Sequence, residues 1–397
     1  MNIRKPLSIF LIFSFLLILR GFFSFIFYKN FISHKIFKIE GYVSNQYKKK
    51  NYYVLKIKSR NFSFYTINRS NLKNLLNENI SIKIFTKNIS FKDYLFGFFA
   101  PSFDLKLKDV SFLEKYIEFQ HKDKKITNLY KALYFGRSID YDTRQKLSTL
   151  GISHLFALSG LHLGVLSGIL FLILSPFYKF FQQRFFPFRN RFFDLGIVVF
   201  FVEFLYLYFT NFPPSLVRAF IMEIVIFISL VYLEKEPLKI LFFTFLASLL
   251  IFFEKVFSIG YFLSFIGVYY IFLFIKYFKI NFVNTLILSF YMYMMMFVIG
   301  HFFFYNFNYY QLLSPIVNIL FSVFYPVSIF VHFIGIGDLF DNLIKWYLNL
   351  GEKYYYVKIH DFTLTVFLFL SLIAYYRKWA FYGINALALS ILLYIIL

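Results

Sequence analysis

Runs of about 20 apolar residues recur along most of the chain, separated by short polar stretches. A helix of that length crosses roughly 30 Å of hydrocarbon. The first run, residues 7–28, follows a short basic stub, which is typical of an uncleaved signal anchor with a cytoplasmic N-terminus. Further runs cover residues 153–175, 192–211, 214–233, 238–253, 257–275, 282–305, 312–334, 361–376 and 379–397. The pattern predicts a polytopic α-helical membrane protein with about ten transmembrane helices.

Residues 29–92 have a different period. The segments IFKIEGYVS, NYYVLKIKS, FSFYTINR and ISIKIFTK alternate β-branched or aromatic residues with polar ones, which is typical of strands. LKNLLNE, between the last two, predicts a short helix. Several short strands in a chain of this length favour a small β-barrel, such as an OB-like domain.

Residues 93–152 mix apolar and charged positions at helical spacing and predict amphipathic helices in the membrane interface. The chain therefore divides into an anchor (1–28), a basic OB-like β domain (29–92), amphipathic or interfacial helices (93–152) and a multi-helix domain (153–397).

Charge gives an orientation to this arrangement. The 397 residues carry a net charge of +22, and residues 29–92 hold 14 Lys or Arg against two acidic residues. The loop 178–191 contains basic residues and no acid, so the positive-inside rule places it in the cytoplasm. The anchor then places residues 29–152 outside. The same count leaves Arg377 and Lys378 outside, unless 312–334 or 361–376 is re-entrant or DLFDNLIKWYLNLGEKYYYVK, residues 338–358, contains an extra segment.

Composition excludes several kinds of site. The chain has no cysteine, which rules out disulfides, Cys-ligated zinc and thiol nucleophiles. Its 64 Phe and 33 Tyr are spread evenly, as expected from the codon bias of an AT-rich genome.

The stretch HLFALSGLHLGVLSG, residues 154–168, concentrates small and polar residues in an apolar run. Glycines four apart let neighbouring helices approach closely. His154 and His162 lie about 80° apart around a helix and do not form an i, i+4 zinc pair. Ser159 and His162 have the spacing of a nucleophile and its base, but no acid is placed to orient the histidine. We therefore expect no catalytic residue, no metal and no cofactor.

Charged residues also enter the apolar runs. Arg218 lies in 214–233 and Glu203 in the preceding run, each at a cost of about 3 kcal/mol on insertion scales. Two interpretations remain open: a structural Arg218–Glu203 ion pair, or a polar path through the membrane. Gly260, Ser264 and Asn318 in later runs favour broken or closely packed helices around a cavity.

These segments resemble the ComEC competence-protein family. Residues 151–164 fit its Gly-x-x-His-Leu-x-Ala-x-Ser-Gly-Leu-His-x-Gly core, PPSLVRAFIM resembles its second element and GYFLSFIGV its third, in the same order, so the resemblance covers about residues 130–335. This chain differs from the family in one further element. The family has Asn-Leu-Leu-x-x-Pro, whereas Asn318-Ile319-Leu320 is not followed by that proline. The sequence also lacks the metallo-β-lactamase-like C-terminal domain of larger members, which makes it a short form.

The resemblance implies a channel that carries single-stranded DNA across the cytoplasmic (inner) membrane during natural transformation, without an enzyme activity of its own. It implies membrane lipid, a DNA-receptor protein and a cytoplasmic helicase or nuclease as partners, and it is compatible with a homo-oligomer. The channel or family-motif residues are His154, Ser159, Gly160, His162, Gly164, Gly168, Glu203, Pro214, Ser215, Arg218, Gly260, Ser264 and Asn318.

The basic β domain is the candidate DNA-binding part, because lysines attract phosphate and tyrosines stack on bases. Its candidate basic and aromatic residues are Lys48, Lys49, Lys50, Tyr52, Lys56, Lys58 and Arg60, with Tyr42, Tyr47, Tyr53 and Phe64 as further stacking residues. The alternative, equally open from the sequence, is a solvated basic face whose aromatic residues belong to the core. Two alternatives stay open for the whole protein: an enzyme or flippase whose Arg218 and Glu203 hold a lipid-linked phosphate, and a scaffold that transports nothing.

Overall fold

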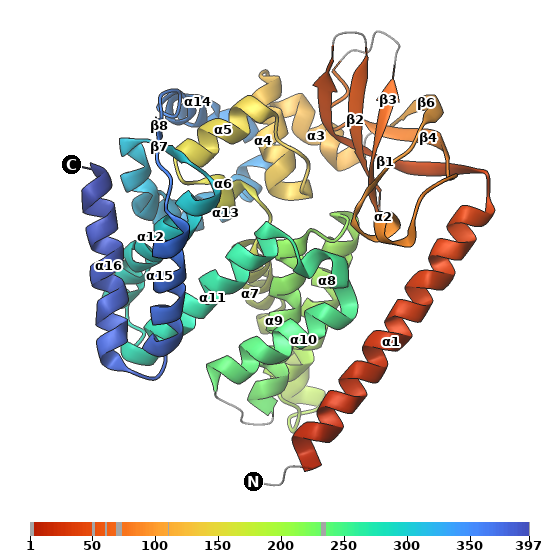
Figure 1. Cartoon of the computed structure of the whole chain (residues 1–397). Coiled ribbons are helices and arrows are strands. Elements are labelled where there is room, and N and C mark those ends of the chain that lie inside the picture. Colours follow the sequence, from red (N-terminus) through yellow and green to blue (C-terminus); the bar gives the residue numbers. More distant parts are fainter. Residues whose placement is uncertain are drawn as a thin grey trace.

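The computed structural model describes residues 4–49, 52–59, 62–68, 74–109, 111–231 and 236–396. A mostly helical body carries one small sheet domain near the N-terminus (Figure 1). Helix α1 (Arg4–Ser33) runs along one flank of the molecule and leads into that sheet. The guanidinium of Arg20 in α1 donates to the carbonyl of Leu249 at 3.0 Å, so this charge inside the anchor is used in packing.

The sheet domain confirms the predicted strands and adds to them. Its strands are β1 (Ile36–Lys48), β2 (Tyr53–Lys58), β3 (Ser63–Asn68), β4 (Asn79–Phe85), β5 (Phe98–Phe99) and β6 (Ser102–Lys108), in the order β5-β3-β2-β1-β4-β6. Alternate residues such as Leu55, Ile57 and Phe64 are fully buried, which gives the domain its own core.

Two local predictions in this region are wrong. Residues 74–78 form a turn where a helix is expected, while 72–73 lie outside the described residues. Strands β5 and β6 also lie in the stretch 93–152, which we expect to be helical. Residues 102–108, SFDLKLK, alternate polar and apolar side chains, which is the period of a strand. Pairing with β4 stabilises them as strand β6.

Short helices follow the sheet and confirm the amphipathic pattern of the rest of that stretch. After α2 (Phe91–Phe96) come α3 (Phe112–Gln120), α4 (Lys124–Phe135), α5 (Tyr141–Thr149) and α6 (Ser153–Phe156). Asp123 caps α4 by accepting from the Lys125 amide, and Gly136 ends it in the left-handed region at φ 66°. The buried faces of these helices pack with α13 and α14 in one core.

Within the part of the chain that the structure describes, seven segments are long and apolar enough to cross a membrane, by length and composition. They are Phe13–Ser33 of α1, α7 (Gly160–Phe185), α8 (Arg191–Phe209), α11 (Ile259–Tyr277), α12 (Phe282–Phe303), Tyr309–Phe333, which contains α13 (Ser314–Phe333), and α16 (Lys378–Ile396). Between them lie α9 (Pro214–Val231), α10 (Pro237–Val256) and α15 (Asp361–Ala374). The chain is a multi-helix membrane protein.

The segment that contains α13 begins and ends at two short strands that pair with each other. The two-residue strand β7 (Asn306–Phe307) precedes it and pairs antiparallel with β8 (Tyr355–Tyr356). Between these strands lie a 3-10 turn, η1 (Tyr309–Leu313), then α13, a second turn, η2 (Gly337–Phe340), and α14 (Asp341–Asn349). The β7–β8 pair therefore closes the base of a long excursion (Figure 1).

A buried clamp fixes the sheet domain to the helices. The side-chain amide of Asn77 donates to the Ser138 carbonyl at 2.7 Å, and the Ser138 amide donates back at 2.8 Å. Next to it, Arg137 donates to Glu114 at 2.7 Å and to Asn79 at 2.9 Å. Because these groups are mostly buried, the sheet and helices are held in one fixed arrangement.

Candidate functional site

The stretch 154–168 is not one helix, in contrast to the predicted run 153–175. Short helix α6 ends at Phe156, and α7 begins at Gly160. Ala157 and Ser159 between them have extended backbones, with ψ of 130° and 178°. The calculated angle of 80° between the two histidines therefore does not apply, because they lie on different helices.

The Ser159–His162 pair shapes the start of α7. The backbone amide of Ser159 donates to Nδ1 of His162 at 3.1 Å, and the Ser159 hydroxyl lies 3.0 Å from the same nitrogen. This is a capping-box arrangement in which histidine replaces the usual Glu or Gln. Nε2 of His162 is buried and has no hydrogen-bond partner among the described residues, so no acid orients the ring. The geometry satisfies a helix terminus and does not form a catalytic triad.

Three hydrogen bonds join the four motif segments that the sequence picked out. The Ser215 hydroxyl, at the start of α9, donates to the Leu158 carbonyl in the α6–α7 break. Arg218 of α9 donates to the Ser264 carbonyl of α11 at 3.1 Å. His154 of α6 lies 3.1 Å from the side-chain oxygen of Asn318 on α13. We call these contacts the motif junction.

Two glycines explain parts of the motif. Gly151 has φ 71°, and an added Cβ would lie 2.7 Å from Cγ of Gln311, so this turn admits only glycine. Gly160 lies against Ala219 of α9, since its added Cβ would be 3.4 Å from the alanine methyl group. Gly164 and Gly168 have open space at the same position, as does Gly260. The predicted close packing along the glycine stripe therefore occurs at Gly160 and not at the next two positions.

The predicted Arg218–Glu203 ion pair is wrong. Glu223 also lies on α9, five residues after Arg218, and the two side chains project about 140° apart around the helix. They therefore face different neighbouring helices. Arg218 faces α11, whereas Glu223 turns toward α7 and α8. There the Ser167 hydroxyl contacts Glu203 and lies 3.4 Å from Glu223. Two carboxylates thus share one hydroxyl inside the helix bundle, away from the arginine.

The sheet domain has one face with unpaired lysines. Lys56 and Lys58 project outward from β2, since the alternate residues Leu55 and Ile57 are buried. Lys56 faces Tyr65 across the β2–β3 pair, and its Nζ lies 5.2 Å from the centre of that ring. Among the described residues, neither these two lysines nor Lys48 and Lys49 form an ion pair. We call the outward side of β1–β3 the strand face.

Lysines on the neighbouring strands β4 and β6 have acidic partners. Lys83 and Lys106 both contact Asp104, at 2.8 and 3.6 Å, and Lys83 above all holds the pKa of that carboxyl below its usual value. Lys108 contacts Glu40 at 2.5 Å. On the strand face, by contrast, Lys56 and Lys58 keep their positive charges without an acidic partner among the described residues.

The predicted stacking residues divide into two groups. Tyr47 and Tyr52 are exposed and lie on or beside the strand face. Phe64 is 0% exposed and belongs to the core of the domain, so the prediction that it stacks on bases is wrong. The same prediction is wrong for Tyr42, which is 4% exposed because the Arg137 guanidinium covers its ring, 4.6 Å from the ring centre. Lys50 and Arg60 lie outside the described residues. Tyr65, which the sequence-based selection missed, is exposed, and its position opposite Lys56 depends on strand register.

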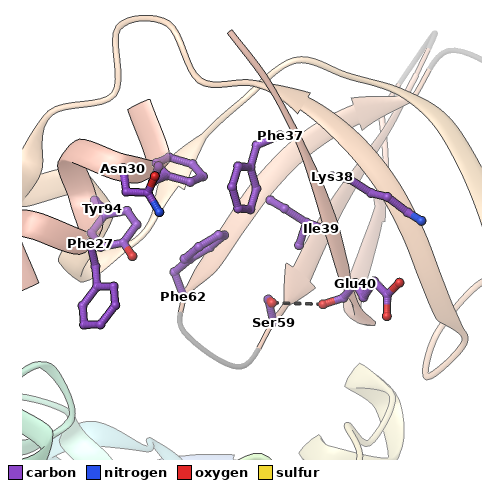
Figure 2. Close-up of a pocket in the computed structure, with 10 residues that line it drawn as sticks. Phe27, Asn30, Phe37, Lys38, Ile39, Glu40, Ser59, Phe62 and Tyr94 are labelled. Atoms are coloured by element: carbon purple, nitrogen blue, oxygen red, sulfur yellow. Dashed lines mark hydrogen bonds between the residues drawn. The ribbon is translucent and has the colours of Figure 1, made fainter. Parts of the chain in front are cut away.

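A pocket of about 210 Å³ lies where α1 enters the sheet domain (Figure 2). Phe27 and Asn30 from α1, Phe62 from the sheet and Tyr94 from α2 line it, and the Ser59 hydroxyl donates to the Glu40 carbonyl at 3.0 Å. Its two charged members, Lys38 and Glu40, have opposite signs. The strand face is therefore the better site for a polyanion.

Fold and site together define a multi-helix membrane protein with a basic extramembrane sheet and a junction of polar contacts between its helices. Residues 133–350 match the family model of the competence proteins. The match covers more than half of the chain, so the protein belongs to the competence-protein family. No curated protein and no solved structure matches the chain.

Proposed function

We propose that this protein carries single-stranded DNA across the cytoplasmic membrane during natural transformation, as a member of the ComEC type. The observation that best supports this proposal is the motif junction. The contacts of Ser215, Arg218 and His154 bring together segments up to 164 residues apart, all within the region that matches the competence family. Contacts that converge in this way are expected of a pathway between helices.

We infer that the sheet domain is an OB-like barrel that first binds the DNA. Residues 98–108 meet both edges of the sheet, since β5 pairs with β3 and β6 pairs with β4. The amide of Ala100 also donates to the Tyr65 carbonyl at 3.0 Å. A closed order of β1-β2-β3-β5/β6-β4 is that of an OB-fold, whose β2–β3 face binds oligonucleotides. The strand face lies at that position.

The membrane topology follows from the β7–β8 pair. Both ends of the excursion between these strands are on one side, and α14, with nine residues, is too short to recross the membrane. If α13 therefore stays on the outer side, the crossings are α1, α7 to α12, α15 and α16. Arg377 and Lys378 then join the 178–191 loop in the cytoplasm, which satisfies the positive-inside rule.

The domain division of the sequence stays part of the proposal, with the barrel extended to Lys108. The channel has no enzyme activity of its own; a DNA-receptor protein delivers the strand, and a cytoplasmic helicase or nuclease supplies the driving force or the degradation. The open positions at Gly164 and Gly168 suit a second copy or the DNA path. The flippase alternative loses its phosphate site, because Arg218 and Glu203 have different partners.

Transformation with labelled chromosomal DNA tests the channel. Deleting the gene abolishes entry of DNA into the cytoplasm, and normal entry in the deletion strain contradicts the proposal. Arg218→Ala, inserted at the wild-type level, lowers entry at least about tenfold, the scale expected when a buried charge-assisted hydrogen bond is removed. Arg377→Ala, with the same charge change at an exposed turn, serves as the control and keeps entry normal. A scaffold would tolerate both substitutions.

A further inference from the structure

Three titratable side chains meet away from the motif junction, at the C-terminal end of α13. His121 ends α3, His332 is in the last turn of α13, and Asp341 begins α14. They are 7%, 4% and 9% exposed, so the protein shields them from water. Elements more than 200 residues apart in sequence are joined here.

The hydrogen bonds form a chain through this cluster. Nδ1 of His121 lies 2.9 and 3.1 Å from the two carboxylate oxygens of Asp341. Nε2 of His121 lies 3.0 Å from Nε2 of His332. Nδ1 of His332 lies 2.6 Å from the Ser328 carbonyl. The Tyr134 hydroxyl lies 3.2 Å from the same Nδ1, but it donates its proton to the Ser328 hydroxyl at 2.9 Å, so it can only accept from His332.

Counting donors fixes the number of protons. A carboxylate and a carbonyl only accept, so both Nδ1 atoms carry hydrogen. Two neutral rings in that tautomer would face each other with lone pairs 3.0 Å apart. The contact needs one more proton, on either Nε2 atom. The pair is then an imidazolium and an imidazole, and the Asp341 carboxylate balances the charge.

We propose that His121, His332 and Asp341 bind one shared proton, which fastens the end of α13 to α3 and α14. This inference goes beyond the proposed function, since it involves no DNA. A proton is favoured over a metal ion because direct contacts of 2.9 to 3.1 Å already join the facing atoms of these three side chains. In the described part of the chain, no group of His, Cys, Asp or Glu side chains has an arrangement that could hold a metal ion. We call the cluster the proton latch.

The groups that surround the latch are compatible with one bound proton. From α4, Tyr130 stacks on His121 with ring centres 4.5 Å apart, and burial raises the pKa values of Tyr130 and Tyr134 far above their usual range, so both stay neutral. Burial raises the pKa of Asp341 and Asp338 of η2 adds to this, while His121 and Lys345 of α14 oppose it. Glu118 of α3 is paired with Lys131 of α4.

The closed form of the proton latch is most stable at one pH. The reason is that the number of protons on its two histidines changes with pH in the open form and stays constant in the closed form. Closed, the two rings hold one extra proton between them. Open, two ordinary histidines hold more than one below about pH 6.5 and less than one above it. Stability of the closed form therefore rises with pH up to about 6.5 and falls beyond it, by up to about tenfold per pH unit in the latch equilibrium.

Hydrogen exchange of the full chain in nanodiscs tests this inference from pH 5 to 8.5, with rates corrected for intrinsic exchange. Amides of α3 are expected to show maximal protection near pH 6.5 and a decline on both sides. With His332→Gln the alkaline decline disappears, because no shared proton remains to be released. His360→Gln alters an exposed histidine at the start of α15 and keeps the two-sided profile.

Three results would overturn the proposal. They are a flat profile in the wild type, a two-sided profile that survives His332→Gln, or protection that changes on adding EDTA or Zn²⁺ at constant pH, which would assign the site to a metal. If His332→Gln does not fold, Asp341→Asn replaces it. That variant removes the balancing carboxylate, so the alkaline decline should move to lower pH; an unmoved profile contradicts the latch.

Discussion

Single contacts decide how the motif residues act. Ser159 and His162 lie close enough for a nucleophile and its base, yet Nδ1 of His162 accepts the Ser159 amide and Nε2 is buried without a partner in the described structure. The pair therefore begins a helix. A capping role and a proton-transfer role predict different tolerances to substitution, so they can be separated.

We predict that His162→Gln supports DNA entry and stability close to those of the wild type, since Gln is the usual partner in a capping box. His162→Ala removes the cap and lowers the free energy of unfolding by about 1 to 2 kcal/mol. Thermal unfolding and labelled-DNA uptake measure the two effects. If Gln proves as inactive as Ala while remaining stable, His162 transfers a proton.

At the scale of helices and strands, the position of residues 309–333 does not follow from hydropathy alone. Residues 309–333 have the length and apolar character of a span. Yet α13 also contacts the short helices that follow the sheet, through Asn318 with His154 of α6 and His332 with His121. Its first turn packs on α12, whose Ser289 hydroxyl donates to the Pro315 carbonyl at 2.8 Å. Both of its ends connect to the strands of one small ribbon. Its tertiary partners decide its position, and its composition does not.

Cysteine labelling tests the position of α13 in a chain that has no natural cysteine. Tyr309→Cys and Leu339→Cys flank α13 at exposed positions, and a membrane-impermeant maleimide should label both from outside intact cells. Ile280→Cys, in the exposed turn between α11 and α12, should react only after the membrane is opened. Labelling of Tyr309→Cys and Leu339→Cys from opposite sides would mean that α13 crosses.

The sequence predicted the elements better than their partners. Period-two and apolar patterns located four strands and the apolar helices, because local periodicity follows from local geometry. The break at Ala157 to Ser159 escaped the pattern, since it depends on the contact of Ser215 with Leu158. The side of α9 from which Arg218 projects, and the pairing of Lys56 with Tyr65, likewise depend on segments far away in the chain.

At the scale of the whole molecule, the sheet domain is held in a fixed position and presents unpaired lysines on one face. The clamp of Asn77 and Arg137 holds the sheet domain against the outer helices, while the unpaired lysines remain on the strand face. Lysines on β4 and β6 have acidic partners in Asp104 and Glu40. If the domain binds DNA, as proposed, we expect binding at the strand face.

Salt dependence of binding measures that preference. For the full chain, the double variant Lys56→Gln, Lys58→Gln should flatten the plot of log affinity for single-stranded DNA against log salt by about 0.7 for each phosphate that the variant no longer neutralises. Lys83→Gln removes a lysine already paired with Asp104 and should change the slope little. Equal slopes for all three proteins would contradict binding at the strand face.

The β7–β8 ribbon has a consequence for how the protein is made. The insertion machinery meets residues 309–333 as a segment apolar enough to span. Strand β8, whose pairing with β7 holds this segment in place, is synthesised only some 20 residues after α13 ends. Until then β7 has no partner to hold the segment in place. If α13 stays on one side of the membrane, as proposed, the orientation of α15 and α16 is therefore set only when this four-residue ribbon closes.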